Sequence, residues 1–281
     1  MAVKIMTDSS ADLPEKLARE YDITVVPLNV HYGEEIFKDG IEIWSDEFYN
    51  RLRNEAFLPD TSEASPSEFL TFYQETTSPE DTIIGIFISQ EMSATIDSAK
   101  SGAKLLENGP KVEIIDSRYV SMALGLIVIK AARMAKTNAT SIEIIAAIHE
   151  WQKNVAVYFT PSSLEYLYRT GRIGKASTMV GSLLNIKPIL SIENGIIVPA
   201  DKVRGNFQKV ASAMVEKLVE QFGKTPLMIC VLHTEIPAFA QILQRTAEEN
   251  LNIAESYPSI VGPIVGSHAG PNTIGIVAIP L

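Results

Sequence analysis

The sequence predicts an α/β protein with two domains, and three observations carry this prediction. The chain has 281 residues, which exceeds the usual size of a single hydrophobic core. Over the first 160 residues, short apolar runs alternate with helical runs, which indicates a parallel sheet with right-handed crossovers. After that point a hairpin and further αβ units indicate a mixed sheet. We therefore expect a parallel α/β/α domain over residues 1–159 and a smaller two-layer α/β domain over residues 160–281.

The strands expected in the first domain are short and mostly apolar, as is typical of strands that helices cover on both faces. We expect them at residues 3–10, 23–32, 82–89, 111–117 and 155–161. Helical periodicity marks the segments between them, at residues 12–21, 65–77, 92–107 and 120–136. Asp12 with Pro14 shortly after it, and Ser65 directly before Pro66, are typical of helix starts. In such sheets, ligands bind beyond the carboxyl ends of the strands.

The second domain begins with a helical segment, followed by a Gly/Ser-rich stretch and a hairpin. Its two strands are joined at Asn194-Gly195, a turn signal whose residues accept positive φ. Helix, strand, helix and two last strands follow, expected at residues 206–223, 226–233, 238–251, 264–265 and 274–279. Between the last two strands His268 lies among glycines and prolines. We expect a tight turn there, with the histidine at a strand end.

Composition excludes several classes of protein. A formal net charge of −10 and the lack of a Lys/Arg run argue against nucleic-acid binding. The start lacks the apolar core of a signal peptide, and the longest apolar stretch is too short to span a bilayer, so we expect a cytoplasmic protein. The single Cys230 excludes an internal disulfide and a multi-Cys zinc site, and it is expected to be a buried core thiol. No metal and no cofactor is expected.

Known catalytic motifs are missing from the sequence. It has no phosphate-binding loop, no G-x-G-x-x-G after a strand and no G-x-S-x-G nucleophile elbow. His149 and Glu150 lack the second histidine of a zinc-binding helix and are expected on a solvated helix face. What remains are hydroxyl-rich strand ends, "TDSS", "DTSEASP" and "SQEMSA". Taken singly, capping of the next helix explains each of them. Taken together, with His233 and His268 at strand ends of the second domain, they predict a polar rim around a pocket between the domains.

Seven motifs resemble the DegV family in order and spacing. They are "KIMTDSSADLP", "TSEASPSEF", "ISQEMSATIDSAK", "IIDSRYVSMALG", "LEYLYRTGRIG", "KPIL" and "VGSHAGPNTIG", and they cover essentially the whole chain. The resemblance implies the two-domain fold expected above and a buried long-chain fatty acid between the domains. It also implies a bacterial protein without catalytic activity of its own. Such a protein presents the carboxylate of the fatty acid to a separate ATP-dependent catalytic subunit of fatty acid kinase.

The resemblance also assigns site residues. It places the carboxylate against Thr61, Ser93 and His268, with Ser62 and Ala94 as further pocket residues. The basic residues near the expected pocket mouth are Arg169, Arg172, Lys175, Lys202 and Arg204. We assign the three arginines to kinase docking or to the phosphate, and the two lysines to ordinary solvated charge. Peripheral membrane contact would serve ligand exchange.

Three positions depart from the family pattern, and one alternative function stays open. Ala94 and Asn272 each replace a common glycine, and Thr170 stands where the family often has a second glycine. None of these changes removes a proposed ligand. The alternative is a self-contained serine hydrolase with Ser93 as the nucleophile and His268 as the base. Against it stands the missing nucleophile elbow. The sequence does not predict acyl chain length, saturation or oligomeric state.

Overall fold

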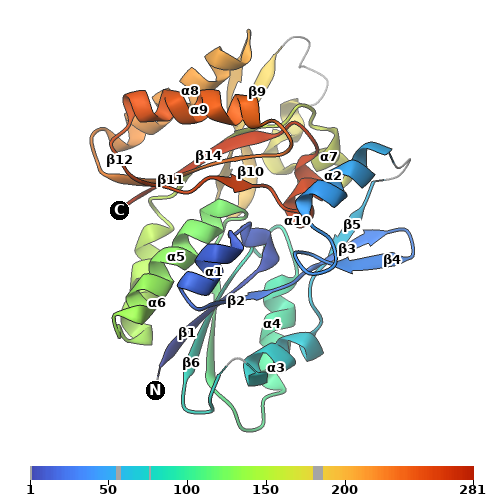
Figure 1. Cartoon of the computed structure of the whole chain (residues 1–281), viewed down its shortest axis with the longest axis vertical. Coiled ribbons are helices and arrows are strands. Elements are labelled where there is room, and N and C mark those ends of the chain that lie inside the picture. Colours follow the sequence, from blue (N-terminus) through green and yellow to red (C-terminus); the bar gives the residue numbers. More distant parts are fainter. Residues whose placement is uncertain (1, 55–57, 76, 180–185) are drawn as a thin grey trace. The chain divides into compact units, whose positions relative to one another are not determined.

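The chain forms two compact units (Figure 1). The computed structural model describes residues 2–54, 58–75, 77–179 and 186–281. The first unit contains residues 1–153 and 262–264, and the second contains residues 154–261 and 265–281. The end of the Gly/Ser-rich stretch, residues 180–185, lies outside the described residues. Within the described residues, no helix is both long enough and apolar enough to cross a membrane.

A parallel sheet forms the centre of the first unit, which confirms the prediction. Its strand order is β2-β1-β6-β7, with bounds β1 Val3–Asp8, β2 Ile23–Val26, β6 Thr82–Phe87 and β7 Lys111–Asp116. The helices are η1 Ser9–Ala11, α1 Glu15–Glu20, α2 Ser45–Asn54, α3 Pro66–Glu75, α4 Thr95–Lys104, α5 Met122–Lys136 and α6 Ser141–Trp151. Helix α5 packs against β1 and β6, and α4 packs against β7 and α3 (Figure 1).

The first unit also contains a small antiparallel sheet, which the sequence did not indicate. Its order is β4-β3-β5, with bounds β3 Asn29–Tyr32, β4 Glu35–Lys38 and β5 Asp60–Ser62. We expected a single strand over residues 23–32, but β2 ends at Val26 and β3 begins at Asn29. Pro27 lies between them, and because proline lacks an N–H it cannot continue the ladder.

In the second unit, seven strands of the described residues form a mixed sheet. Its order is β10-β9-β8-β14-β11-β12, and β13 also pairs with β11. The bounds are β8 Ala156–Thr160, β9 Lys187–Glu193, β10 Ile196–Val203, β11 Leu227–His233, β12 Ile253–Ser256, β13 Ser259–Ile260 and β14 Ile274–Pro280. The helices are α7 Glu165–Arg169, η2 Gly174–Met179, α8 Phe207–Phe222 and α9 Pro237–Asn250. Helix α10, Pro263–Ala269, has its first two residues in the first unit and the rest in the second.

The strands of the second unit agree with one expectation and contradict another. The predicted hairpin is confirmed, since β9 and β10 pair across Asn194 and Gly195, whose φ angles are 50° and 85°. The placement of residues 155–161 in the parallel sheet was wrong. Strand β8 instead pairs antiparallel with β14 and β9, because an apolar run fits either sheet and its sequence does not select a partner.

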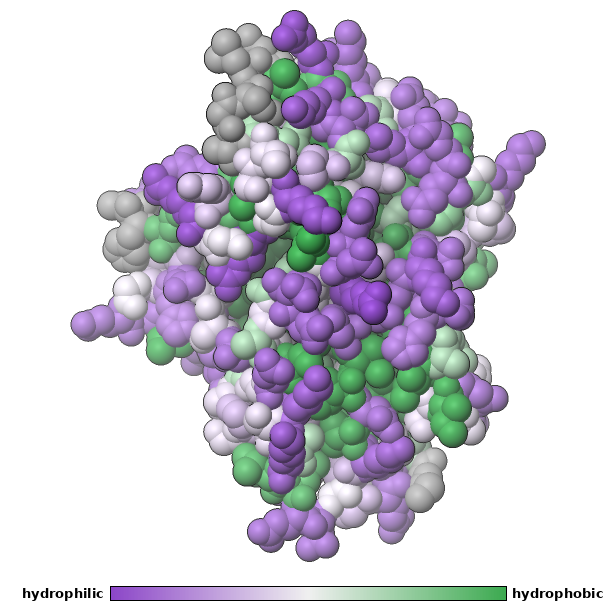
Figure 2. Space-filling model, turned by 180° about the vertical axis from the view of Figure 1, so that it is seen from behind, coloured by the Kyte–Doolittle hydropathy of each residue, from purple (hydrophilic) through white to green (hydrophobic). Residues whose placement is uncertain are grey.

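The core of the second unit lies between this sheet and two helices. Helices α8 and α9 pack together and cover the sheet with apolar side chains (Figure 1). Among the fully buried members are Val210, Met214, Leu218, Leu243 and Ile276. Cys230 on β11 is buried, as predicted for a core thiol. On the face drawn in Figure 2, hydrophilic side chains alternate with hydrophobic patches, which is ordinary for a protein surface.

Candidate functional site

Thr61 and Ser62 form the end of β5, a strand of only three residues. In its pairing with β3, Thr61 lies opposite Val30 and Ser62 lies opposite Asn29. Because side chains alternate along a strand, Thr61 and Ser62 point to opposite faces of this small sheet. Both residues are half-buried, whereas Val30 is fully buried. Neither residue caps the next helix, because both belong to the paired strand β5.

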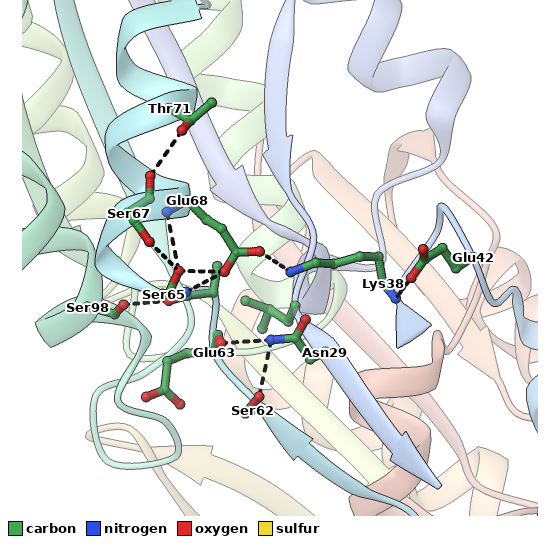
Figure 3. Close-up of polar contacts among 12 residues, drawn as sticks. Asn29, Lys38, Glu42, Ser62, Glu63, Ser65, Ser67, Glu68, Thr71 and Ser98 are labelled. Carbon is green, nitrogen blue, oxygen red and sulfur yellow. Dashed lines mark hydrogen bonds and ion pairs between the residues drawn. The ribbon is translucent and has the colours of Figure 1, made fainter. Parts of the chain in front are cut away.

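Side chains of β3 hold the chain directly after Thr61 (Figure 3). The amide of Asn29 donates to Ser62 Oγ at 3.1 Å and to the carbonyl oxygen of Glu63 at 3.0 Å. On the same face, His31 Nε2 lies 2.8 Å from Ser62 Oγ. These bonds connect β3 with Ser62, the last residue of β5, and with Glu63, which follows it.

The start of α3 is fixed by a capping arrangement that extends to β4 (Figure 3). Ser65 Oγ accepts a hydrogen bond from the Glu68 amide at 3.3 Å, and the Ser65 amide donates to Glu68 Oε2 at 2.7 Å. This confirms the helix start predicted at Ser65-Pro66. Glu68 also forms an ion pair with Lys38. Partial burial raises the pKa of Glu68, but the hydrogen bonds from Lys38 and Ser65 outweigh it and leave the pKa lowered.

Ser93 lies in the turn between β6 and α4. Its backbone amide donates to the carbonyl of Ser89 at 3.1 Å. Its hydroxyl lies 2.9 Å from Thr95 Oγ1 and accepts a hydrogen bond from the Thr95 amide at 3.3 Å. Ser93 thus binds the first amide of α4 from the residue before the N-cap position, which Ala94 occupies, so it is not the N-cap expected from the sequence. Ala94 is exposed and directly precedes the helix.

Within the first unit, α4, which follows Ser93, lies beside α3 and the residues that follow Thr61. Ser98 of α4 donates a hydrogen bond to the carbonyl of Ala64 (Figure 3). One turn further along α4, a Cβ on Gly102 would lie 2.7 Å from the carbonyl oxygen of Pro66 and 2.7 Å from Phe69 Cβ. The absence of a side chain at Gly102 therefore allows α4 to approach α3 closely.

His268 lies in α10, which corrects the expectation of a strand end and turn. Residues 264 and 265 are also helical, because glycine and a first-turn proline accommodate a short helix as readily as a turn. The turn lies directly after the last residue of α10, at Gly270, whose φ is 76°. A Cβ there would lie 2.4 Å from the ring of Tyr166 in α7. The end of α10 therefore packs closely against α7 within the second unit. His268 itself is half-buried.

The three arginines of interest also lie in the second unit. Arg169, at the end of α7, forms an exposed ion pair with Glu165 at 2.6 Å. Arg172 donates to the carbonyl of Thr170 and is half-buried, while Arg204 follows β10 and is exposed. Arg169 thus belongs to the same helix as Tyr166, which contacts the turn after His268. Thr61 and Ser93 belong to the first unit, so a joint site with His268 stays a prediction.

A group of buried carboxyls lies beside the end of β1, and sequence reasoning missed its arrangement. Asp8 accepts hydrogen bonds from the amides of Ser10 at 3.0 Å and Ile88 at 2.9 Å. Asp12 accepts from the amide of Gly262 at 2.8 Å, so it is not the cap of α1 as expected. Burial raises the pKa of Asp12 to about 8 and that of Asp39 to about 7. No group of three or more His, Cys, Asp or Glu residues among the described residues is arranged to hold a metal ion.

Other residues that position the site had no signal of their own in the sequence. Asn29, His31 and Ser98 look like ordinary polar residues of a strand and a helix. Their roles depend on which strand pairs with β5 and which helix packs against α3, and a single sequence does not give those pairings. The run "NVHY" does alternate polar and apolar residues, and this was the one available sign of a half-buried strand.

Comparisons with known proteins agree on one family. The family model described as "Uncharacterised protein, DegV family" matches residues 2–281. A DegV domain-containing protein of Caldanaerobacter subterraneus subsp. tengcongensis is 34% identical over 98% of this chain and 97% of its own length. A structure titled as fatty acid binding of a DegV family protein from Thermus thermophilus has a TM-score of 0.93, with 28% identity and full coverage of both chains. The structure of DegV from Bacillus subtilis, titled a fatty acid binding protein, has a TM-score of 0.89 and 30% identity, again with full coverage of both chains.

Proposed function

This chain belongs to the DegV family, and from this premise we propose that it binds a long-chain fatty acid. We propose that Thr61, Ser93 and His268 hold the carboxylate of the fatty acid. The proposal rests on the likeness, over the full length of both chains, to two solved structures of DegV proteins that bind fatty acid. The arrangement of the first unit supports it, because α4, which follows Ser93, lies beside α3 and the residues that follow Thr61.

The chemistry of these side chains suits a carboxylate head group. Hydroxyls donate single hydrogen bonds, and an imidazole N–H donates another, so the carboxylate is held without a full counter-charge. Burial of the acyl tail supplies about 0.8 kcal/mol per CH₂ group, which over a long chain offsets the cost of enclosing the head group. Ser62 and Ala94 flank the two hydroxyl residues and are proposed as further pocket residues.

We further propose that the protein presents the bound acid to a separate ATP-dependent kinase subunit. In that reaction a carboxylate oxygen attacks the γ-phosphorus of ATP, so that an acyl phosphate and ADP form. Neutral donors leave the attacking oxygen more nucleophilic than a bidentate arginine would. Arg169, Arg172 and Arg204 are proposed to dock the kinase or to face the phosphoryl group. Peripheral membrane contact would allow the fatty acid to exchange.

Mass spectrometry of the protein purified from bacteria tests this function against the hydrolase alternative. Native spectra should show a non-covalent adduct with the mass of an intact fatty acid, and denaturing spectra should show the bare chain. A covalent acyl group on Ser93 would instead support a hydrolase with Ser93 as the nucleophile. A preparation that neither carries nor takes up fatty acid would overturn the proposal.

A further inference from the structure

We infer that Asn29 is the positioning residue of the head-group site, because it fixes the end of β5 and so sets the direction of the Thr61 hydroxyl. The inference rests on the proposed function, since it assumes that Thr61 meets the carboxylate. It adds a residue that does not itself contact the ligand. Asn29 lies on β3, opposite Ser62, and its side chain acts on the residues that follow Thr61.

Strand β5 needs such support because it is very short. It has three residues, and among the described residues it pairs along one edge, with β3. A strand of this length is at the lower limit of what occurs in folded proteins. The side-chain amide of Asn29 adds two further bonds at its end, one to Ser62 Oγ and one to the Glu63 carbonyl (Figure 3). Both N–H groups of the amide are used in these bonds.

The bonds to Ser62 also set the direction of the neighbouring Thr61 side chain. Ser62 points to the Asn29 face of the sheet, so Thr61 points to the opposite face, beside Val30. A rotation of the backbone at Ser62 would therefore turn the Thr61 hydroxyl as well. His31 adds a bond on the Asn29 face, at 2.8 Å from Ser62 Oγ. The two β3 side chains thus hold one face of β5, and the hydroxyl that we assign to the carboxylate lies on the other.

The residues beyond Glu63 have separate supports, so removal of the amide should act locally. Ser98 binds the carbonyl of Ala64, and Glu68 caps α3 at Ser65 and pairs with Lys38. None of these bonds involves Asn29. A variant at Asn29 should therefore keep α3 and α4 in place and release only the end of β5.

The substitution Asn29→Ala removes both donors without adding a charge and therefore decides the test. Asn29→Asp keeps nearly the same volume but carries no N–H, and one of its oxygens would face the Glu63 carbonyl oxygen, an acceptor, at about the 3.0 Å now spanned by a hydrogen bond. Because the aspartate also adds a negative charge that would itself repel a carboxylate ligand, its effect counts only together with the same effect in Asn29→Ala. Asn252→Asp is the matched control, since the amide of Asn252 also donates to a backbone carbonyl, that of Lys224 at 2.9 Å, in the second unit.

The measurement is the ratio of two affinities, for palmitic acid and for the alcohol of the same chain length. A charged acceptor depends on aligned donors more than a hydroxyl does. We expect Asn29→Asp and Asn29→Ala to lower the acid-to-alcohol ratio about tenfold or more, while Asn252→Asp leaves it unchanged. In a folded Asn29→Ala variant, an acid-to-alcohol ratio equal to that of the unaltered protein overturns the inference alone, also where both affinities fall together. If the unaltered protein binds the acid no better than the alcohol, the proposed head-group site fails and the inference fails with it.

Discussion

Replacement of Asp12 by Asn should remove much of the pH dependence of stability in this protein. The Asp12 carboxyl accepts hydrogen bonds from the Gly262 amide and from the Ser121 hydroxyl. Asparagine can keep both bonds, because its oxygen accepts from Gly262 and its amide donates to Ser121 Oγ. It also tolerates the backbone at this position, where φ is 50°. The variant therefore removes the charge and little else.

The sign of the effect follows from burial. Burial raises the pKa of Asp12 from 3.8 to about 8, with smaller raising contributions from the nearby carboxyls of Asp39 and Asp8 and a lowering contribution from the hydrogen bonds of Ser121 and Gly262. Between about pH 4 and pH 8 the folded state therefore binds more protons than the unfolded state, and the free energy of unfolding falls as the pH rises through this window. At ~1.4 kcal/mol per unit, the loss attributable to Asp12 is several kcal/mol by pH 8. Asp12→Asn should recover on the order of 3 kcal/mol at pH 9 and show little change at pH 4.

Urea unfolding at pH 4, 7 and 9 measures this difference. The matched control is Asp22→Asn, since Asp22 also has positive φ, at 54°, but is exposed and pairs with Lys4 at the surface. The control should move the unfolding midpoint little, because exposed ion pairs contribute at most about 1 kcal/mol. Burial also raises the pKa of Asp39, to about 7, so some pH dependence should remain in Asp12→Asn. An Asp12→Asn protein that is less stable than the unaltered chain at pH 9 would refute the reasoning.

Three further predictions concern ligand, partner and packing. Ser93→Ala should fold but retain less fatty acid after purification, because loss of one donor to a charged acceptor costs ~1.5–3 kcal/mol; a full complement of the same acid would contradict this. Arg169→Ala and Arg204→Ala should bind fatty acid normally yet be phosphorylated more slowly by a cognate kinase, most clearly at low salt, whereas Arg19→Ala, which removes a similar exposed ion pair, should leave the rate unchanged. Equal rates in all three arginine variants, or loss of fatty acid binding, would count against that division of roles. Gly270→Ala should lower the thermal midpoint, because its Cβ would lie 2.4 Å from a tyrosine ring at a φ of 76°; an unchanged midpoint would show that the contact is not required.

Local signals in the sequence predicted the elements that depend on local chemistry. The parallel strands of the first unit follow from apolar runs between helical ones, and the start of α3 follows from Ser65 and Pro66. The β9–β10 hairpin follows from Asn194-Gly195, because both residues adopt positive φ. Asn272, expected to tolerate a left-handed backbone, has a φ of 56°.

Features that depend on long-range pairing did not follow from the sequence. The run at 155–161 is as apolar as the strands of the first sheet, so nothing local assigned β8 to the second sheet. For the same reason, the sequence did not predict that β5 pairs with β3, and the role of Asn29 depends on this pairing. The site assignments came from family resemblance, and the structure adds the local supports of Thr61 and Ser93. His268 was expected at a strand end but belongs to α10, because a short run of small and apolar residues is compatible with either.

The most direct test of the account is a crystal structure of this protein with palmitic acid bound. The account predicts an acyl chain enclosed by the protein, with the carboxylate oxygens within hydrogen-bonding distance of Thr61 Oγ1, Ser93 Oγ and a ring nitrogen of His268. A carboxylate bound elsewhere, or an acyl chain covalently attached to Ser93, would contradict it.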